Sequence, residues 1–184
     1  MKALSGISIV LLVIISYACS KEDTNRVSIP VDKKFDLNGD LIADVSITYK
    51  LYSGNINGSK YEIIKGQLTF ENPENELMEY DSVGFLLHNN DTIFMNPDST
   101  QHKWRKGGLV LVTRFHYSDS DWPEYWSIRD ESIENTFYLG FRIQMNPESK
   151  IIGWMKLGIS NITGDIIITE DEYSVEEYMV VVSE

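Results

Sequence analysis

Hydrophobic and polar residues alternate along most of this chain, in short segments bounded by Gly, Asn, Asp and Pro. Alternation with a period of two residues is typical of β-strands that bury one face, and the bounding residues favour turns. Segments of this kind lie at 45–52, 61–70, 83–87, 92–95, 108–117, 136–144, 151–160, 165–169 and 178–182. The sequence lacks a convincing amphipathic helix with 3.6-residue periodicity. The pattern predicts about nine or ten strands in an all-β fold, an antiparallel β-sandwich of jelly-roll-like form.

The same alternation predicts which residues share a face. The predicted sets are Val45, Ile47, Tyr49 and Leu51 in one strand, Ile64, Gly66, Leu68 and Phe70 in the next, and Leu109, Leu111, Thr113, Phe115 and Tyr117 in the strongest one. The segments 83–87 and 92–95 are predicted to pair as a hairpin. The acidic segment 71–81, which contains Pro73, is predicted to be a solvated loop with room for a short helical turn.

A longer hydrophobic run opens the chain: seven consecutive aliphatic residues, Ile9 to Ile15, are followed by the only cysteine, Cys19. The run is too short to span a bilayer, because a transmembrane helix needs about 20 residues. It fits the hydrophobic region of a secretory signal, with Lys2 before it and the small Ala18 before the cleavage site. The predicted organisation is a signal peptide at 1–18, a lipidated N-terminus and tether at 19–34, and a single β-sandwich domain at 35–184.

The residues that end this run, Ser16-Tyr17-Ala18-Cys19, resemble the processing site of bacterial lipoproteins, with Ser16 where that family usually has Leu. The next four, Ser20 to Asp23, are similar to the export signal of Gram-negative surface lipoproteins. The resemblance implies that Cys19 is lipidated and that the protein lies on the outer membrane, facing the cell exterior. Two or more acyl chains bind a membrane stably, because each buried CH₂ contributes about 0.8 kcal/mol. The alternative is a secretory signal cleaved after Ala18, which would leave a free thiol.

The composition excludes several classes of partner. A net charge of −12 disfavours binding to nucleic acid, whose phosphates require Lys and Arg, and disfavours peripheral binding to anionic lipid. A single cysteine provides neither a disulfide nor a cysteine-based metal site. The three histidines, His88, His102 and His116, are widely spaced, so a zinc site is not expected.

An oxygen-rich loop precedes the first strong strand. Oxygen ligands at positions 1, 3, 5 and 9 of a tight loop, with a backbone carbonyl at position 7, are those that Ca²⁺ prefers. These ligands are Asp36, Asn38, Asp40 and Asp44, with the Ile42 carbonyl. The loop is not an EF-hand, since its glycine is at position 4 and position 12 is Ile47. The alternative is an Asn-Gly turn between strands, and a bound Ca²⁺ would be structural.

The same loop resembles the Asp-rich loop of many secreted bacterial β-sandwich domains that often precede a PEP-CTERM sorting tail. Gly153-Trp154 is similar to the late Gly-Trp strand of those domains. The resemblance implies a β-sandwich and does not imply an activity.

Aromatic and acidic residues are concentrated between Tyr117 and Trp126, around Pro123. Planar aromatic rings stack on the apolar faces of sugars, and neighbouring carboxylates accept hydrogen bonds from hydroxyl groups. Trp122, Tyr125 and Trp126 would form such a glycan site. The alternative is that these rings fold back and cap one end of the sandwich.

Two further surface features are candidates. The basic cluster His102 to Lys106 could receive an anionic ligand, pair with the acidic 71–81 segment, or form a solvated hairpin end. Three Asp-Ser/Thr pairs resemble the acceptor sites of bacterial protein O-glycosylation, with Ser82, Thr92 and Ser99 as the acceptors. The resemblance implies surface glycosylation.

Catalytic motifs such as GxSxG and HExxH are absent from the sequence. A glycosidase needs two carboxylates, and the candidates Glu170, Asp171 and Glu172 follow no known pattern. The sequence therefore predicts a surface-anchored lipoprotein with a non-catalytic binding or interaction domain, whose partner is a glycan or a protein. The alternatives are a glycan-binding accessory protein of a polysaccharide-uptake system and, less favoured, a small glycan-active hydrolase.

Overall fold

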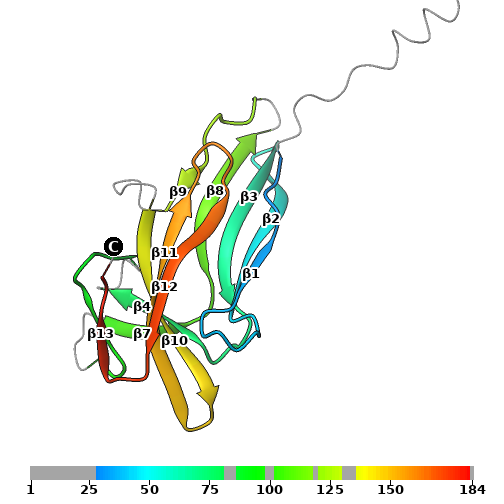
Figure 1. Cartoon of the computed structure of the whole chain (residues 1–184). Helices are drawn as coiled ribbons and strands as arrows, with labels where there is room; N and C mark the ends of the chain where they lie inside the picture. The colour runs from blue at the N-terminus through cyan, green and yellow to red at the C-terminus, as the bar shows by residue number, and fades with distance from the viewer. Residues whose placement is uncertain (1–27, 81–85, 98–101, 118–119, 130–135, 183–184) are drawn as a thin grey trace, which may run out of the picture.

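The computed structural model describes residues 28–80, 86–97, 102–117, 120–129 and 136–182 (Figure 1). These residues form thirteen β-strands, all paired antiparallel, so the predicted all-β sandwich is confirmed, with more strands than expected. None of the described residues belongs to a helix long and apolar enough to cross a membrane. The predicted signal peptide, Cys19, Ser82 and Ser99 lie outside the described residues.

Two sheets and a small ribbon make up the domain. The first sheet contains, in spatial order, β1 (Lys33–Phe35), β2 (Val45–Ile56), β3 (Ser59–Phe70), β8 (Leu109–Tyr117) and β9 (Ser127–Ile128). The second contains β12 (Ile166–Ser174), β11 (Ser149–Ile159), β10 (Thr136–Asn146), β4 (Glu76–Tyr80) and β7 (His102–Lys106), with β5 (Leu86–Leu87) also paired to β10. The ribbon consists of β6 (Thr92–Phe94) and β13 (Tyr178–Val180).

The chain connects the sheets by crossing between them after β3, β7 and β9. As a result β8 lies beside β3 and β10 lies beside β4, a nesting found in Greek-key and jelly-roll folds. The hairpin β2–β3 and the meander β10–β11–β12 keep consecutive strands in one sheet.

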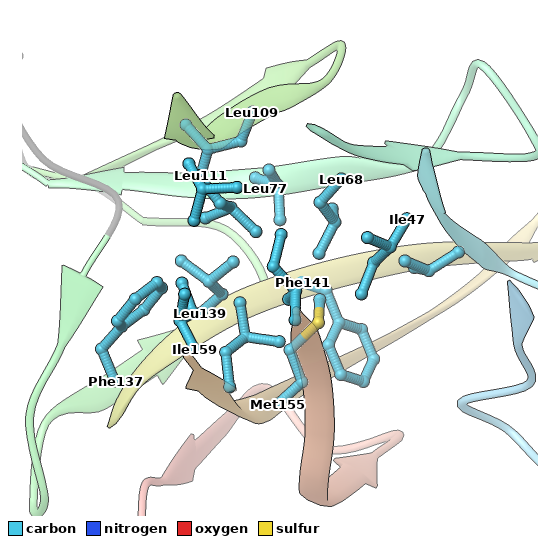
Figure 2. Close-up of a cluster of buried hydrophobic side chains, with 14 of the residues drawn as sticks. Ile47, Leu68, Leu77, Leu109, Leu111, Phe137, Leu139, Phe141, Met155 and Ile159 are labelled. Carbon is cyan, nitrogen blue, oxygen red and sulfur yellow. The ribbon is translucent and has the colours of Figure 1, made fainter. Parts of the chain in front are cut away.

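The main core lies between the two sheets (Figure 2). Val45, Ile47 and Leu68 face inward as predicted and have no exposed surface, whereas Leu51, predicted on the same face, is 50% exposed because β2 extends beyond the core there. From the second sheet they meet Phe137, Leu139, Phe141, Ile143, Met155 and Leu157. Burial of an aliphatic side chain of this size contributes about 1.5–3 kcal/mol, so this layer supplies most of the folding free energy.

The ribbon covers the other face of the second sheet and encloses a smaller core. Its members are Met78, Leu87, Ile93, Ile152, Trp154, Met179 and Val181. β11 is therefore buried on both faces, which explains its nearly continuous apolar sequence. The predicted hairpin of 83–87 with 92–95 is wrong, because β5 pairs with β10 and β6 pairs with β13.

The acidic segment 71–81 contains strand β4 and is not a solvated loop. Leu77 and Met78 are each 1% exposed and face different cores. Glu76 is the buried acidic residue of this strand, and its carboxylate accepts a hydrogen bond from Arg142 Nε at 2.8 Å. The acidic residues made this segment look like a solvated loop, because the basic residues that pair with Glu76 and Glu79 lie far away in the sequence.

The basic segment 102–106 forms β7 along the edge of β4. Arg105 lies 3.2 Å from Glu79, and Lys106 lies 2.5 Å from Glu74. Pairing with the 71–81 segment was one of the interpretations left open for this cluster, and the structure shows that pairing.

The N-terminal strand β1 lies along one edge of the first sheet and pairs with β2 at three positions. The Lys33 ammonium lies 2.6 Å from the Asp165 carboxylate and donates to the Ile166 carbonyl at 3.1 Å. Because Ile166 begins β12, this side chain ties β1 to the second sheet.

Candidate functional site

The Asp36–Asp44 loop uses its side-chain oxygen atoms to close a turn. The Asp36 carboxylate accepts hydrogen bonds from three backbone N–H groups, those of Asn38, Gly39 and Leu41. The same pattern recurs along the loop, where the Asn38 and Asp40 side chains accept from the N–H groups of Asp40 and Ile42. These are Asx contacts, which replace the backbone hydrogen bonds that a turn leaves unmade.

Asp44 is the buried residue of this loop, and it accepts a hydrogen bond from the Leu37 N–H at 2.9 Å. Burial raises the pKa of Asp44 against the effect of that bond, and the charges of Asp40 and Asp36 raise it further. Burial, followed by the Asp36 charge, also raises the pKa of Asp171 on β12. Among the described residues, no group of three or more His, Cys, Asp or Glu side chains is arranged to hold a metal ion. The side-chain oxygen atoms of the loop accept hydrogen bonds from its own backbone N–H groups, and the Ca²⁺ site stays a prediction.

The predicted aromatic loop packs on the end of the sandwich through Trp126, which is only 3% exposed. The Trp126 backbone N–H donates to the Asn161 carbonyl at 2.7 Å. Its ring meets Tyr49 edge-on, with 6.4 Å between the centroids. Gly164 packs so tightly beneath it that a Cβ atom there would lie 2.3 Å from the indole. Trp126 therefore caps the core at this end.

Tyr49 fixes this end of the first sheet to the second. Its hydroxyl donates to the Gly164 carbonyl and accepts from the Ile166 N–H, both at 3.0 Å. Burial raises the pKa of Tyr49 to about 12; the hydrogen bond from Ile166 opposes this, and the charges of Asp165 and Asp32 add to it. The neutral hydroxyl is thus the form that the fold favours.

Trp122 and Tyr125 take up separate positions in the same loop. Trp122 is half-buried and stacks on His116, with ring centroids 4.5 Å apart and planes 14° apart. Tyr125 is 53% exposed, and its hydrogen bond with Glu124 raises its pKa. Because Trp126 is buried, the three predicted residues do not share one exposed surface.

The structure assembles a different aromatic surface on the first sheet. The registers of β2, β3 and β8 place Tyr52, Ile63 and Phe115 in one row and Gly54, Tyr61 and Tyr117 in the next. Both rows point away from the second sheet, since the alternate residues Ile64 and Leu68 lie in the core. The aromatic platform is defined here as Tyr52, Tyr61, Ile63, Phe115 and Tyr117.

The rings of the aromatic platform contact one another across the strands. Tyr61 stacks on Phe115 with centroids 5.7 Å apart and planes 15° apart. Tyr117 meets Phe115 edge-on at 4.6 Å. Gly54 makes room for Tyr61, because a Cβ at this position would lie 2.4 Å from the Tyr61 hydroxyl oxygen. Tyr52 and Tyr117 remain 44% and 43% exposed, so a ligand can reach these two rings.

Sequence reasoning missed the aromatic platform because of a β-bulge. Strict alternation predicted Phe115 and Tyr117 on the same face as Leu109 and Leu111. The register between β3 and β8 shifts at Gly66, which leaves one extra residue in β8. One extra residue exchanges the two faces of a strand. The leucines therefore remain in the core, and the two aromatic residues turn outward.

A hollow of about 550 Å³ adjoins the aromatic platform at the tip of the β2–β3 hairpin. It is lined by Ser53, Gly54, Asn55, Lys60, Tyr61, Glu62 and His116. His116 Nε2 donates to the Ser120 carbonyl at 2.6 Å, and its Nδ1 lies 3.8 Å from the Glu62 carboxylate. By strand alternation most of these residues face the opposite side of the sheet from the aromatic platform, and the hollow meets the platform only at Gly54 and Tyr61.

The candidate catalytic carboxylates lie on β12, and neighbours along this strand point to opposite sides. Glu170 lies 2.7 Å from the Lys156 ammonium, and that hydrogen bond raises the pKa of Lys156. Glu172 is opposite Trp154 on the same side, whereas Asp171 is opposite Met155 and faces the other way. Glu170 is therefore already paired with a cation.

Thr92, the one described member of the predicted glycosylation set, begins β6 and pairs with Val180. It is half-buried, and the preceding Asp91 carboxylate accepts from the His88 N–H at 2.7 Å. Modification at this residue stays a prediction.

Comparison with known protein families, with characterised proteins and with solved structures gives no match for this chain.

Proposed function

We propose that this chain is an exported, lipid-anchored protein whose β-sandwich binds a carbohydrate polymer outside the cell without transforming it. The observation that carries the proposal is the aromatic platform, a group of rings on the outward face of β2, β3 and β8.

Exposed aromatic rings of this kind are favourable for sugar binding because one face of a pyranose ring carries C–H groups. Those groups pack against an aromatic ring, and the sugar hydroxyls remain free to bond to polar neighbours. Contiguous apolar patches on a protein surface are commonly interaction sites. Tyr52 and Tyr117 flank the platform with exposed rings, and Lys50, Lys65 and Thr113 provide polar groups on the same outward face.

A binding role without catalysis is supported by the arrangement of the carboxylates. A glycosidase needs one carboxylic acid that holds a proton and a second carboxylate beside the same bond. Glu170 is paired with Lys156, and Asp171 faces the opposite side of the sheet from both neighbouring glutamates. The lipid anchor rests on the resemblance of residues 16–23 to lipoprotein signals.

Affinity electrophoresis through gels that contain neutral or acidic polysaccharides would test the proposal. We expect at least one polymer to retard the protein. We expect Tyr52→Ala and Tyr117→Ala each to lower the affinity for that polymer about tenfold, as judged from the retardation. The matched control is Tyr173→Ala, because Tyr173 is 48% exposed on β12, away from the platform. Thermal unfolding of each variant would verify that the fold is intact. Unaltered mobility on every gel would exclude carbohydrate binding.

A further inference from the structure

We infer that the polymer bound by the aromatic platform is acidic, a polysaccharide of uronate residues whose carboxylates pair with Lys50 and Lys65. This inference rests on the proposed function, because it names the class of ligand for the same surface.

The two lysines are directly opposite each other across β2 and β3, on the outward face. Like charges at such positions lie about 5 Å apart at Cβ and destabilise a sheet. Neither lysine has an ion-pair partner among the described residues, although the Lys65 ammonium lies 5.4 Å from the centre of the Tyr52 ring. An anionic ligand would relieve this repulsion.

Charge is distributed unevenly between this surface and the rest of the chain. The whole sequence has 28 acidic and 16 basic residues. The strands β2, β3 and β8 together contain only one acidic residue, Glu62, against four basic ones, Lys50, Lys60, Lys65 and Arg114. Of the four, Lys50 and Lys65 are on the outward face, whereas Lys60 and Arg114 alternate to the other face. Glu62 faces the other side of the sheet, toward His116. The three strands therefore contribute two lysines and no carboxylate to the outward face, and the Asp32 carboxylate lies at the edge of β2, where it accepts from the Tyr49 N–H at 2.9 Å.

A local positive charge can act on a ligand even though the net charge of the protein is negative. Salt screens exposed charges beyond about 8–10 Å, so distant acidic residues contribute little at this surface. Close ammonium groups dominate the potential that a bound polymer experiences.

Uronates match the spacing between the lysines and the aromatic rings. The row of Lys50 and Lys65 is two residues along each strand from the row of Tyr52 and Ile63, a distance of about 6.8 Å. A uronate has a pyranose face for stacking and a carboxylate on the same ring. When the ring stacks on Tyr52, a flexible lysine side chain can reach its carboxylate and form a charge-assisted hydrogen bond.

The test compares each acidic polymer with its uncharged counterpart. The probes are polygalacturonate and alginate, each beside its own ester, in affinity electrophoresis at low and at high salt. We expect retardation by at least one acid form, weaker retardation by its ester, and a loss of affinity at high salt. The double variant Lys50→Gln/Lys65→Gln should bind that acid form at least tenfold more weakly and its ester equally well. Lys103→Gln, an exposed lysine on β7, is the control and should behave like the wild type.

The outcomes separate this inference from the proposed function. If a neutral polymer or an ester binds as well as any acid form, in a manner that depends on Tyr52 but not on the lysines, the inference is overturned and the platform remains a glycan site. If the lysine variant binds the acid form normally, the inference also fails. If no polymer is bound, or binding is unchanged in the Tyr52 and Tyr117 variants, both proposals fail.

Discussion

Replacing Tyr49 with phenylalanine tests whether one hydroxyl group joins the two sheets. The change removes a single oxygen atom and leaves the ring packed against Trp126. It also leaves the Gly164 carbonyl and the Ile166 N–H without the partner that each has at 3.0 Å. Ile166 has no exposed surface, so water cannot easily replace that partner.

The expected loss in the free energy of unfolding can be estimated from these contacts. Each lost hydrogen bond removes about 0.5–1.5 kcal/mol, and a stranded buried donor adds a desolvation penalty of about 1–3 kcal/mol. The two lost bonds and the stranded donor together amount to about 2–6 kcal/mol, so we expect Tyr49→Phe to destabilise the protein by at least about 2 kcal/mol, which lowers the midpoint of thermal unfolding by about 5 °C or more.

Urea denaturation at neutral pH would measure the difference. Tyr52→Phe is the matched control, because Tyr52 is on the same strand with an exposed ring, and this variant should lie within about 0.5 kcal/mol of the wild type. A Tyr49→Phe protein that is as stable as this control would refute the bridging role.

The same pair of proteins makes a prediction about pH. The pKa of Tyr49 is raised from 10.0 to about 12, so the unfolded chain loses this proton before the folded protein does. The contribution of Tyr49 is fully present below pH 10 and is lost as pH rises to about 12. The advantage of the wild type over Tyr49→Phe should therefore shrink across this interval. A constant difference would contradict the assigned pKa.

Three further predictions concern the cap, the anchor and the loop. Gly164→Ala combines a φ of +73° with a clash against Trp126, and should destabilise the protein by about 2 kcal/mol or more in a thermal unfolding scan. Gly58→Ala is the control, because Gly58 has a φ of +89° in open space and its replacement should destabilise the protein less. Cys19→Ser should move the protein from the membrane fraction to the soluble fraction on cell fractionation, and a protein that stays in the membrane would exclude the lipid anchor. Millimolar Ca²⁺ should raise the midpoint of unfolding, EDTA should reverse this, and Asp40→Asn should abolish the response; an unchanged midpoint would leave the loop as a turn.

The fold class could be predicted from the sequence because half-buried strands repeat with a period of two. Val45 and Ile47 illustrate this, since both were assigned to the core from alternation and both are fully buried. Strand β4 was missed because Glu76 made it look solvated, and Arg142, which neutralises that charge, lies 66 residues away in the sequence. Local patterns do not show long-range ion pairs.

The candidate site was harder to predict than the fold, for a related reason. Tyr52 and Phe115 are far apart in the chain, and only strand register places them in one row. The bulge in β8 then exchanged the faces that alternation had assigned. Capping of one end of the sandwich is one of the two interpretations that the sequence leaves open for the aromatic loop, and the 3% exposure of Trp126 agrees with it for that ring, whereas Tyr125 is 53% exposed. A signal was nevertheless present, because β2, β3 and β8 are poor in acidic residues in an acidic chain.

The attachment of β1 has a mechanical consequence. A tension applied through the chain at residue 28 would reach Lys33 before any other strand residue, and β1 is held by pairing at three backbone positions and by the ion pairs of Lys33 with Asp165 and of Lys34 with Glu71. The twelve-residue pairing of β2 with β3 lies behind it and would bear load only after β1 has peeled away. The resistance of the domain to stretching from this end is therefore set first by the short pairing of β1, whose strength falls as salt screens its two ion pairs. The large core would hold after that pairing has opened.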